Sequence, residues 1–302
     1  MYFCRHKQII FLAKIVFICK TLKFIGLKNL IFFTIFLFFT ISFAQNTIVI
    51  DQPNNQSTAS KQVSNFSIEA PQLKTTKNIW VYLPKNYENS TKKFPVIYMH
   101  DAQNLFDKTT SYAGEWNIDE TLDSLNAEVI VIGIENGGEK RMEELAPFKN
   151  EKYGGGNANN YLNFTVNTLK PFVDKTYRTK SDAKNTCIFG SSLGGLISYY
   201  ALLKYPKIFG KAGIFSPAFW FNRKEIFELT DKTKKLKSKI YFLCGDNEGD
   251  VDVIKDLNSI ENKINTIRCS CKMLNKKIIV KGGQHNEKLW REGFKKAYLW
   301  LF

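Results

Sequence analysis

The 302-residue sequence predicts an α/β domain, in which a mostly parallel central sheet carries helices on both faces. Short apolar runs alternate with longer segments of helical periodicity. Most of these runs are apolar at every position, which is typical of strands buried on both faces. From Phe66 onward we find no repeat and no break rich in Pro, Gly or Ser. We therefore expect one domain over residues 66–302.

The expected strands are short and come in a regular order. "NIWVYLP" at 78–84 alternates in the manner of a half-exposed strand. Six continuous apolar runs follow, at 94–100, 128–135, 186–190, 211–217, 239–246 and 276–283. In such a sheet, reactive groups gather at the carboxyl ends of the strands.

Helices are expected between these strands and after the last one, at 116–125, 157–177, 193–206, 251–264 and 287–302. The second of these helices has a clear apolar stripe. Its large apolar residues recur close to the spacing of one helix face and are predicted to be buried, namely Tyr161, Phe164, Leu169, Phe172 and Val173.

The formal charge of +15 does not indicate a nucleic-acid-binding protein. Six of the positive charges lie in residues 1–44, which contain no acid, so the rest of the chain carries +9 with scattered lysines. A scattered excess of lysine favours solubility, and no aromatic-basic motif accompanies it. We expect no nucleic-acid partner.

The N-terminal 44 residues are typical of an export signal. "KNLIFFTIFLFFTISFAQ" has Lys28, a short apolar run and small residues before Gln45, which predicts a secretory signal peptide that ends at Ala44. The run is shorter than the 20 or so residues that span a bilayer. A second apolar patch in residues 1–27 is either an over-extended start or a retained anchor. The protein is thus expected in the periplasm or outside the cell, with membrane contact only through this segment.

Residues 45–65 are polar and predict a leader or linker. The exported part of the chain has four cysteines. Cys187 and Cys244 lie in apolar strand-like runs and are expected to be small buried hydrophobic residues. Cys269 and Cys271 form C-x-C without a partner at metal-ligand spacing, so we expect no structural zinc site.

The sequence "GSSLG" at 190–194 is a G-x-S-x-G motif with Ser192 at its centre. Glycines at both ends allow a sharp turn from strand to helix, which leaves the serine hydroxyl exposed at the tip. The following helix directs its positive amino end at the same point. A buried strand before the motif and a helix after it favour a nucleophilic serine over a merely tight turn.

A serine nucleophile needs a base, and residues 45–302 hold two histidines. His285 follows the last expected strand and is the candidate base. His100 ends the 94–100 strand, and its side chain could either pack in the core or line the cleft. The loop after the 239–246 strand supplies Asp246, Glu248 and Asp250, which lack the ligand spacing of a calcium loop. The chain order Ser, acid, His matches that of α/β-hydrolases.

The chain resembles the esterase branch of the α/β-hydrolases that contains enterobactin-type siderophore esterases, esterase D, feruloyl and acetylxylan esterases, and mycolyltransferases. The resemblance covers about residues 66–302. It rests on "YLPKNY", "FPVIYMHDAQNLFD", "EWNIDETL", "VIGIENGGEKRMEELAPF", "FGSSLGGLISYYALLKYPKIFGKAGIFSPAFWF", "CGDNEGD" and "GGQHNEKLWREGF". It implies an α/β-hydrolase fold and a serine esterase.

By position, the resemblance implies Ser192 as nucleophile, His285 as base and Glu248 as acid, with Asp250 as the alternative acid. It implies an oxyanion hole made of the backbone N–H groups of Leu193 and Gln103. Relatives usually have glycine where Ala102 stands, so alanine would be strained if that position needs a positive φ.

Four further residues lie on segments that border the cleft in relatives, namely Trp116, Arg141, Glu144 and Trp220. Trp116 and Trp220 are candidate substrate-binding residues, although Trp220 could equally be a core residue. Arg141 could bind a polar or acidic substrate group, or pair with Glu143 or Glu144.

The resulting expectation is hydrolysis of a small-molecule or carbohydrate ester through an acyl-enzyme, with no metal and no organic cofactor. Two alternatives stay open. The acyl group could pass to a sugar or lipid hydroxyl instead of water. The protein could also be a non-catalytic carbohydrate- or siderophore-binding protein on a hydrolase scaffold.

Overall fold

The computed structural model describes residues 56–249, 252–267 and 274–302. The predicted signal peptide, most of the predicted leader, Asp250, Cys269 and Cys271 lie outside these residues. No helix of the described residues combines the length and the apolar composition that crossing a bilayer requires.

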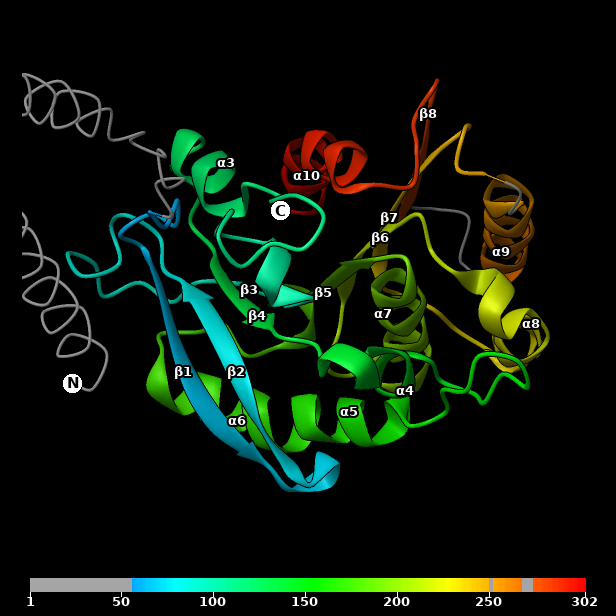
Figure 1. Cartoon of the computed structure of the whole chain (residues 1–302), viewed down its shortest axis with the longest axis horizontal. Coiled ribbons are helices and arrows are strands. Elements are labelled where there is room, and N and C mark those ends of the chain that lie inside the picture. The colour runs from blue at the N-terminus through cyan, green and yellow to red at the C-terminus, as the bar shows by residue number, and fades with distance from the viewer. Residues whose placement is uncertain (1–55, 250–251, 268–273) are drawn as a thin grey trace, which may run out of the picture. The chain divides into compact units, whose positions relative to one another are not determined.

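An eight-stranded sheet forms the centre of the fold (Figure 1). Its strands stand in the order β1-β2-β4-β3-β5-β6-β7-β8. β1, β2 and β4 pair antiparallel, and all other neighbours are parallel. The strands are β1 Val63–Ala70, β2 Thr75–Tyr82, β3 Val96–His100, β4 Ile130–Ile134, β5 Thr186–Ser191, β6 Lys211–Phe215, β7 Lys239–Gly245 and β8 Asn275–Val280. The α/β class and the mostly parallel sheet are confirmed.

Helices cover both faces of the sheet. Apolar residues of α3 (Ile118–Ser124) and α10 (Glu287–Leu301) form one buried cluster with one face, and Figure 1 shows these two helices together. The opposite cluster contains residues of the remaining long helices. These are α4 Arg141–Leu145, α5 Ala158–Phe164, α6 Lys170–Thr176, α7 Leu193–Lys204, α8 Arg223–Lys232 and α9 Val253–Ile267. Short 3₁₀ turns occur at Pro71–Leu73, Ala102–Asn104, Gly138–Lys140, Ala183–Asn185 and Phe219–Asn222.

The predicted helix over 157–177 contains a π-helical turn. Thr165–Leu169 joins α5 to α6, and Pro171 follows within the first turn of α6. A proline lacks the N–H that an α-helical hydrogen bond would use, and a π turn inserts one extra residue. This insertion shifts the helical phase. Phe172, which was expected on the buried face, is instead 40 % exposed and packs against Phe66 of β1.

The folded part of the chain extends further toward the N-terminus than the predicted boundary at Phe66. Val63–Asn65 belong to β1 and pair with Trp80–Tyr82. These three residues were assigned to the leader because they are largely polar. An edge strand needs only backbone hydrogen bonds and one covered face, so its sequence signal is weak.

Candidate active site

Ser192 lies on the turn between β5 and α7. Its backbone has φ 56° and ψ −121°, a conformation that is rare for residues other than glycine. Its N–H donates to the carbonyl oxygen of Phe215 on the neighbouring strand at 3.0 Å. This hydrogen bond holds the turn against β6, so the serine remains in its strained conformation.

The glycines around Ser192 allow backbone segments to approach closely. A Cβ on Gly190 would lie 2.7 Å from the carbonyl carbon of Gly194. A Cβ on Gly195 would lie 2.9 Å from the carbonyl oxygen of Phe215. The start of α7 therefore packs directly against β5 and β6, which explains why this stretch of sequence has so little side-chain bulk.

His285 and Glu248 meet at the carboxyl end of the sheet. His285 lies between β8 and α10, and Glu248 lies on the loop after β7. Glu248 Oε2 is 3.1 Å from Nδ1 of His285. The ring of His285 also meets that of Trp290 edge-on, with centroids 5.1 Å apart. With Nδ1–H donating to the carboxylate, the other ring nitrogen, Nε2, is the one available to accept a proton.

Three donors hold the carboxylate of Glu248, whose side chain is 2 % exposed. Besides His285, Oε1 accepts from the hydroxyl of Ser216 and from the N–H of Gly245, each at 2.6 Å. Burial alone would raise the pKa of Glu248, but these hydrogen bonds hold it below its ordinary value. Ser216 in turn accepts from the indole N–H of Trp290 at 2.9 Å. The carboxylate is thus ionised and fixed in position.

A cavity of about 640 Å³ opens at this edge of the sheet. Ser192 and His285 both line it, as do Trp116, Trp290 and Arg141. The rest of its wall comes from polar and small residues of the loops after β3 and β4 and before α3, including Gln103, Asn104, Tyr112, Ala113 and Asn136. The volume is in the range of sites for small ligands.

The two predicted oxyanion donors come from different elements, the helix that follows Ser192 and the 3₁₀ turn after β3. Leu193 is the first residue of α7, where backbone N–H groups have no acceptor within the helix. Gln103 is in the 3₁₀ turn after β3, and its side-chain amide pairs with the backbone of Asn136 at 3.2 and 3.3 Å. The positive φ of this loop, 58°, belongs to Asp101 and not to Ala102. Ala102 is therefore unstrained, and its Cβ packs toward Gly133.

Arg141 pairs with Asp101, a partner that the sequence analysis did not consider. The guanidinium binds both carboxylate oxygens, at 2.6 and 2.9 Å. Burial alone would raise the pKa of Asp101, but Arg141 and Asn136 hold it below its ordinary value. Neither of the two acids considered as its partner binds Arg141: Glu144 binds the buried Lys77 at 2.6 Å, and Glu143 accepts from the N–H of Gly155 at 3.1 Å. The positive charge in the cavity wall is thus already balanced.

The two candidate tryptophans have different surroundings. Trp116 lines the cavity and is 3 % exposed, with its ring stacked on Phe215. Trp220 is 37 % exposed and does not line the described cavity. It packs against Tyr153 and Phe221 on the surface turn after β6. Trp116 therefore forms part of the cavity wall, and Trp220 does not.

His100 is buried in the core and also lines the cavity, so it has both of the roles considered for it. It is 2 % exposed, and its Nδ1 is 2.8 Å from the hydroxyl of Tyr161. Burial lowers the pKa of His100 to about 4, with Asp101 opposing this shift and Arg141 adding to it. His100 is therefore neutral at physiological pH. Its Nε2 has no hydrogen-bond partner among the described residues.

Three residues around the site were missed in the sequence analysis: Ser216, Trp290 and Asp101. Ser216 directly follows a buried strand, and Asp101 follows another, which is the position where functional groups collect in such sheets. Trp290 follows His285 by five residues on α10 and carries no comparable signal. Of the acids near Glu248, Asp246 accepts from the N–H of Gly282 at 2.6 Å, a contact that holds the loop.

Residues 70–301 match the family model described as "Putative esterase". The uncharacterized protein YbbA of Bacillus subtilis is 29 % identical over 176 residues, which cover 56 % of this chain and 68 % of that protein. An endo-1,4-beta-xylanase/feruloyl esterase of Xylanibacter ruminicola is 25 % identical over 213 residues, 67 % of this chain but 26 % of the relative. The crystal structure of an enterobactin esterase from Shigella flexneri superimposes with a TM-score of 0.65 at 19 % identity, over 80 % of this chain and 59 % of that one.

Proposed function

The chain belongs to the esterase family and is a carboxylic ester hydrolase, and we propose that it cleaves esters through an acyl-enzyme formed on Ser192. In this proposal His285 is the general base, and Glu248 holds and stabilises its ring. One observation carries it: Glu248 binds Nδ1 of His285, which leaves Nε2 available in the cavity that Ser192 also lines.

The reaction proceeds in two steps. Ser192 Oγ attacks the ester carbonyl carbon while His285 Nε2 takes the hydroxyl proton. The N–H groups of Leu193 and Gln103 stabilise the resulting oxyanion, an interaction that is typically worth about 3–4 kcal/mol for one donor. The imidazolium then protonates the departing alcohol, and the carbon–oxygen bond of the ester breaks. Water, deprotonated by His285, releases the acid from Ser192 in the same way.

The substrate we propose is a small-molecule or carbohydrate ester. Two similar proteins are named as a feruloyl esterase and an enterobactin esterase, and both of these substrates are esters of this class. Arg141 is neutralised by Asp101, so the cavity has no unpaired arginine for an anionic group. Comparing acetylated xylan, feruloylated sugars, ferric siderophores and short nitrophenyl esters as substrates would identify the preferred acyl and alcohol groups.

Removing the Ser192 hydroxyl tests the proposal. Ser192→Ala should lower turnover of a nitrophenyl ester by at least about a thousandfold, because no other group can form the acyl-enzyme. A matched control is Ser198→Ala on α7, the helix that follows Ser192, because the buried Ser198 hydroxyl donates to the carbonyl of Gly194. The control should keep its activity. Undiminished turnover by a folded Ser192→Ala protein would contradict the proposal.

We also propose that the protein is exported by way of residues 1–44. The support is the sequence pattern of a positive start, a short apolar run and small residues before Gln45. N-terminal sequencing of the protein recovered outside the cytoplasm should begin at Gln45. A start at Met1 would favour a retained anchor instead.

A further inference from the structure

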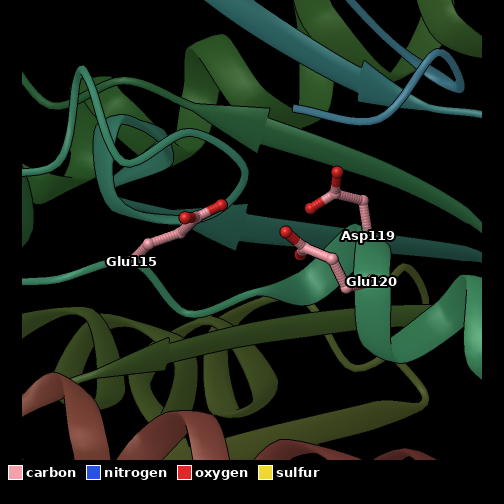
Figure 2. Close-up of side chains that lie close together, drawn as sticks. All are labelled: Glu115, Asp119 and Glu120. Carbon is pink, nitrogen blue, oxygen red and sulfur yellow. The ribbon is translucent and has the colours of Figure 1, made fainter. Parts of the chain in front are cut away.

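Three carboxylates converge at the start of α3 (Figure 2). Glu115 lies on the loop before the helix, and Asp119 and Glu120 lie in its first turn. One oxygen from each carboxylate lies within 4.8 Å of the other two. Figure 2 shows the three side chains pointing toward one another, so a single small ion could contact them all.

Two of these carboxylates are buried and incompletely bonded. Asp119 is fully buried and Glu115 is 7 % exposed. One oxygen of each is engaged: Asp119 Oδ2 accepts from the N–H of Ser60 at 2.7 Å, and Glu115 Oε2 accepts from the hydroxyl of Thr58 at 3.0 Å. Their other oxygens, Asp119 Oδ1 and Glu115 Oε1, have no hydrogen-bond donor among the described residues. A buried carboxylate oxygen without a partner is costly, so these two oxygens need a ligand.

The negative charge of the cluster is also unbalanced. None of the ion pairs among the described residues includes these three carboxylates. Arg291 is nearby, but its guanidinium donates to the backbone carbonyl of Glu115 at 2.8 Å and not to the side chain. A cation bound between the three carboxylates would relieve their mutual repulsion and give the two unpartnered oxygens a ligand.

We propose that Glu115, Asp119 and Glu120 bind one Ca²⁺ ion. Carboxylate oxygens are the ligands of hard cations, and the cluster has no thiolate or imidazole to favour zinc. Mg²⁺ usually keeps several of its waters and is seldom held in a cage made of protein oxygens alone, whereas Ca²⁺ accepts such a cage, so the burial of Glu115 and Asp119 favours Ca²⁺. Ser60 adds a buried hydroxyl without a partner among the described residues, next to Asp119.

The ion would join three segments that the chain brings together here. The first segment, with Thr58 and Ser60, precedes β1. The second is the loop that ends near Glu115 and supplies Tyr112 and Ala113 to the cavity. The third is the first turn of α3, which contains Asp119 and Glu120. Trp116, another lining residue, directly follows Glu115. The proposed ion therefore stabilises one wall of the cavity and takes no part in the bond-breaking steps.

Calcium binding can be measured without any activity assay. The full-length chain is treated with EGTA, and then Ca²⁺ or Mg²⁺ is added separately. Ca²⁺ at about a hundred times its Kd should raise Tm by about 5 °C or more, and titration calorimetry should give one ion per chain. The absence of both a Tm shift and a binding isotherm at millimolar Ca²⁺ would overturn the proposal, as would a response to Mg²⁺ alone.

Two variants connect the ion with these residues. Glu120 is exposed, so Glu120→Gln should fold and keep its Tm in EGTA. We expect its affinity for Ca²⁺ to fall at least about tenfold, and its Tm rise at the same Ca²⁺ concentration to be at most about half that of the wild type. Asp119→Asn should also lose binding, and Glu120→Gln decides the question if Asp119→Asn does not fold. Glu128→Gln is the control, because this exposed carboxylate pairs with Lys92 outside the cluster. An unchanged Ca²⁺ response in Glu120→Gln would overturn the proposal.

Discussion

At the scale of single residues, the hydrogen bonds of Glu248 determine which nitrogen of His285 can act. Ser216 and Gly245 bind one carboxylate oxygen, which leaves the other for Nδ1 of His285. Trp290 fixes the hydroxyl of Ser216 and also contacts the His285 ring. The proposed acid, Glu248, and the proposed base, His285, are thus both positioned by Trp290.

His100 predicts a specific dependence of stability on pH. Its folded pKa of about 4 lies below the ordinary 6.5, so the unfolded chain binds the proton more tightly. The stability contributed by neutral His100 is fully present above about pH 6.5 and is lost as the pH falls toward 4. Between pH 7.5 and pH 4.5 this loss is about 2 kcal/mol.

The measurement is urea unfolding of the wild type and of His100→Gln at both pH values. Gln has no proton to bind, and its amide can still pair with the hydroxyl of Tyr161. The free energy of unfolding of the variant should fall about 2 kcal/mol less between the two values. Asp101 and Glu248 titrate in both proteins, so their contributions cancel. Equal losses in the two proteins would show that His100 is not held neutral by the fold.

At the scale of elements, the contact between β5 and α7 depends on the absence of side chains. Gly190→Ala would place a Cβ 2.7 Å from the backbone of Gly194, where neither strand nor helix can yield. We expect a loss of about 2–4 kcal/mol in the free energy of unfolding, in the range of severe overpacking.

Gly194→Ala is the matched comparison. Its nearest contact is a side-chain atom of His100 at 3.3 Å, so its loss should be smaller. Denaturant unfolding measures both, and a larger loss for Gly194→Ala would contradict this account.

Most elements could be predicted because their apolar residues follow a clear period. The runs that became β3 to β8 and the helices α3, α7, α9 and α10 correspond closely to their predicted ranges. β1 was missed because its outward positions are polar and its pairing with β2 is a tertiary interaction. The π turn before α6 was missed because hydrophobic periodicity does not register a single inserted residue.

The site could be predicted only where a motif fixes the local backbone. Ser192 followed from its flanking glycines, and Glu248 and His285 from their positions after strands and from the family resemblance. The Asp101–Arg141 pair and the Ser216–Trp290 hydrogen bond could not be predicted. They depend on which loops meet at the end of the sheet, and neither spacing nor composition contains that information.

At the scale of the whole molecule, the segment before β1 is bound to the cavity wall. Ser57 donates to Asp107 at 2.5 Å, and Ser60 and Thr58 bind Asp119 and Glu115. These contacts lie within the predicted leader 45–65. The segment therefore supports the loop from which Tyr112, Ala113 and Trp116 line the cavity.

Truncation tests this boundary. A chain that starts at Phe66 should be about 2–4 kcal/mol less stable to unfolding than one that starts at Gln56. The loss reflects several hydrogen bonds at about 1 kcal/mol each and the first pairs of β1. Thermal and urea unfolding measure the difference. If both chains have the same stability, residues 57–65 do not contribute to the fold.

The central claim is that Ser192 carries the acyl group, and pre-steady-state kinetics tests it most directly. Mixing the enzyme with a nitrophenyl ester should release a burst of nitrophenol close to one equivalent per chain, followed by slower turnover. Mass spectrometry of the quenched protein should find the acyl group on the peptide that contains Ser192. Acylation of a different residue, or a burst of the same size in Ser192→Ala, would contradict the account.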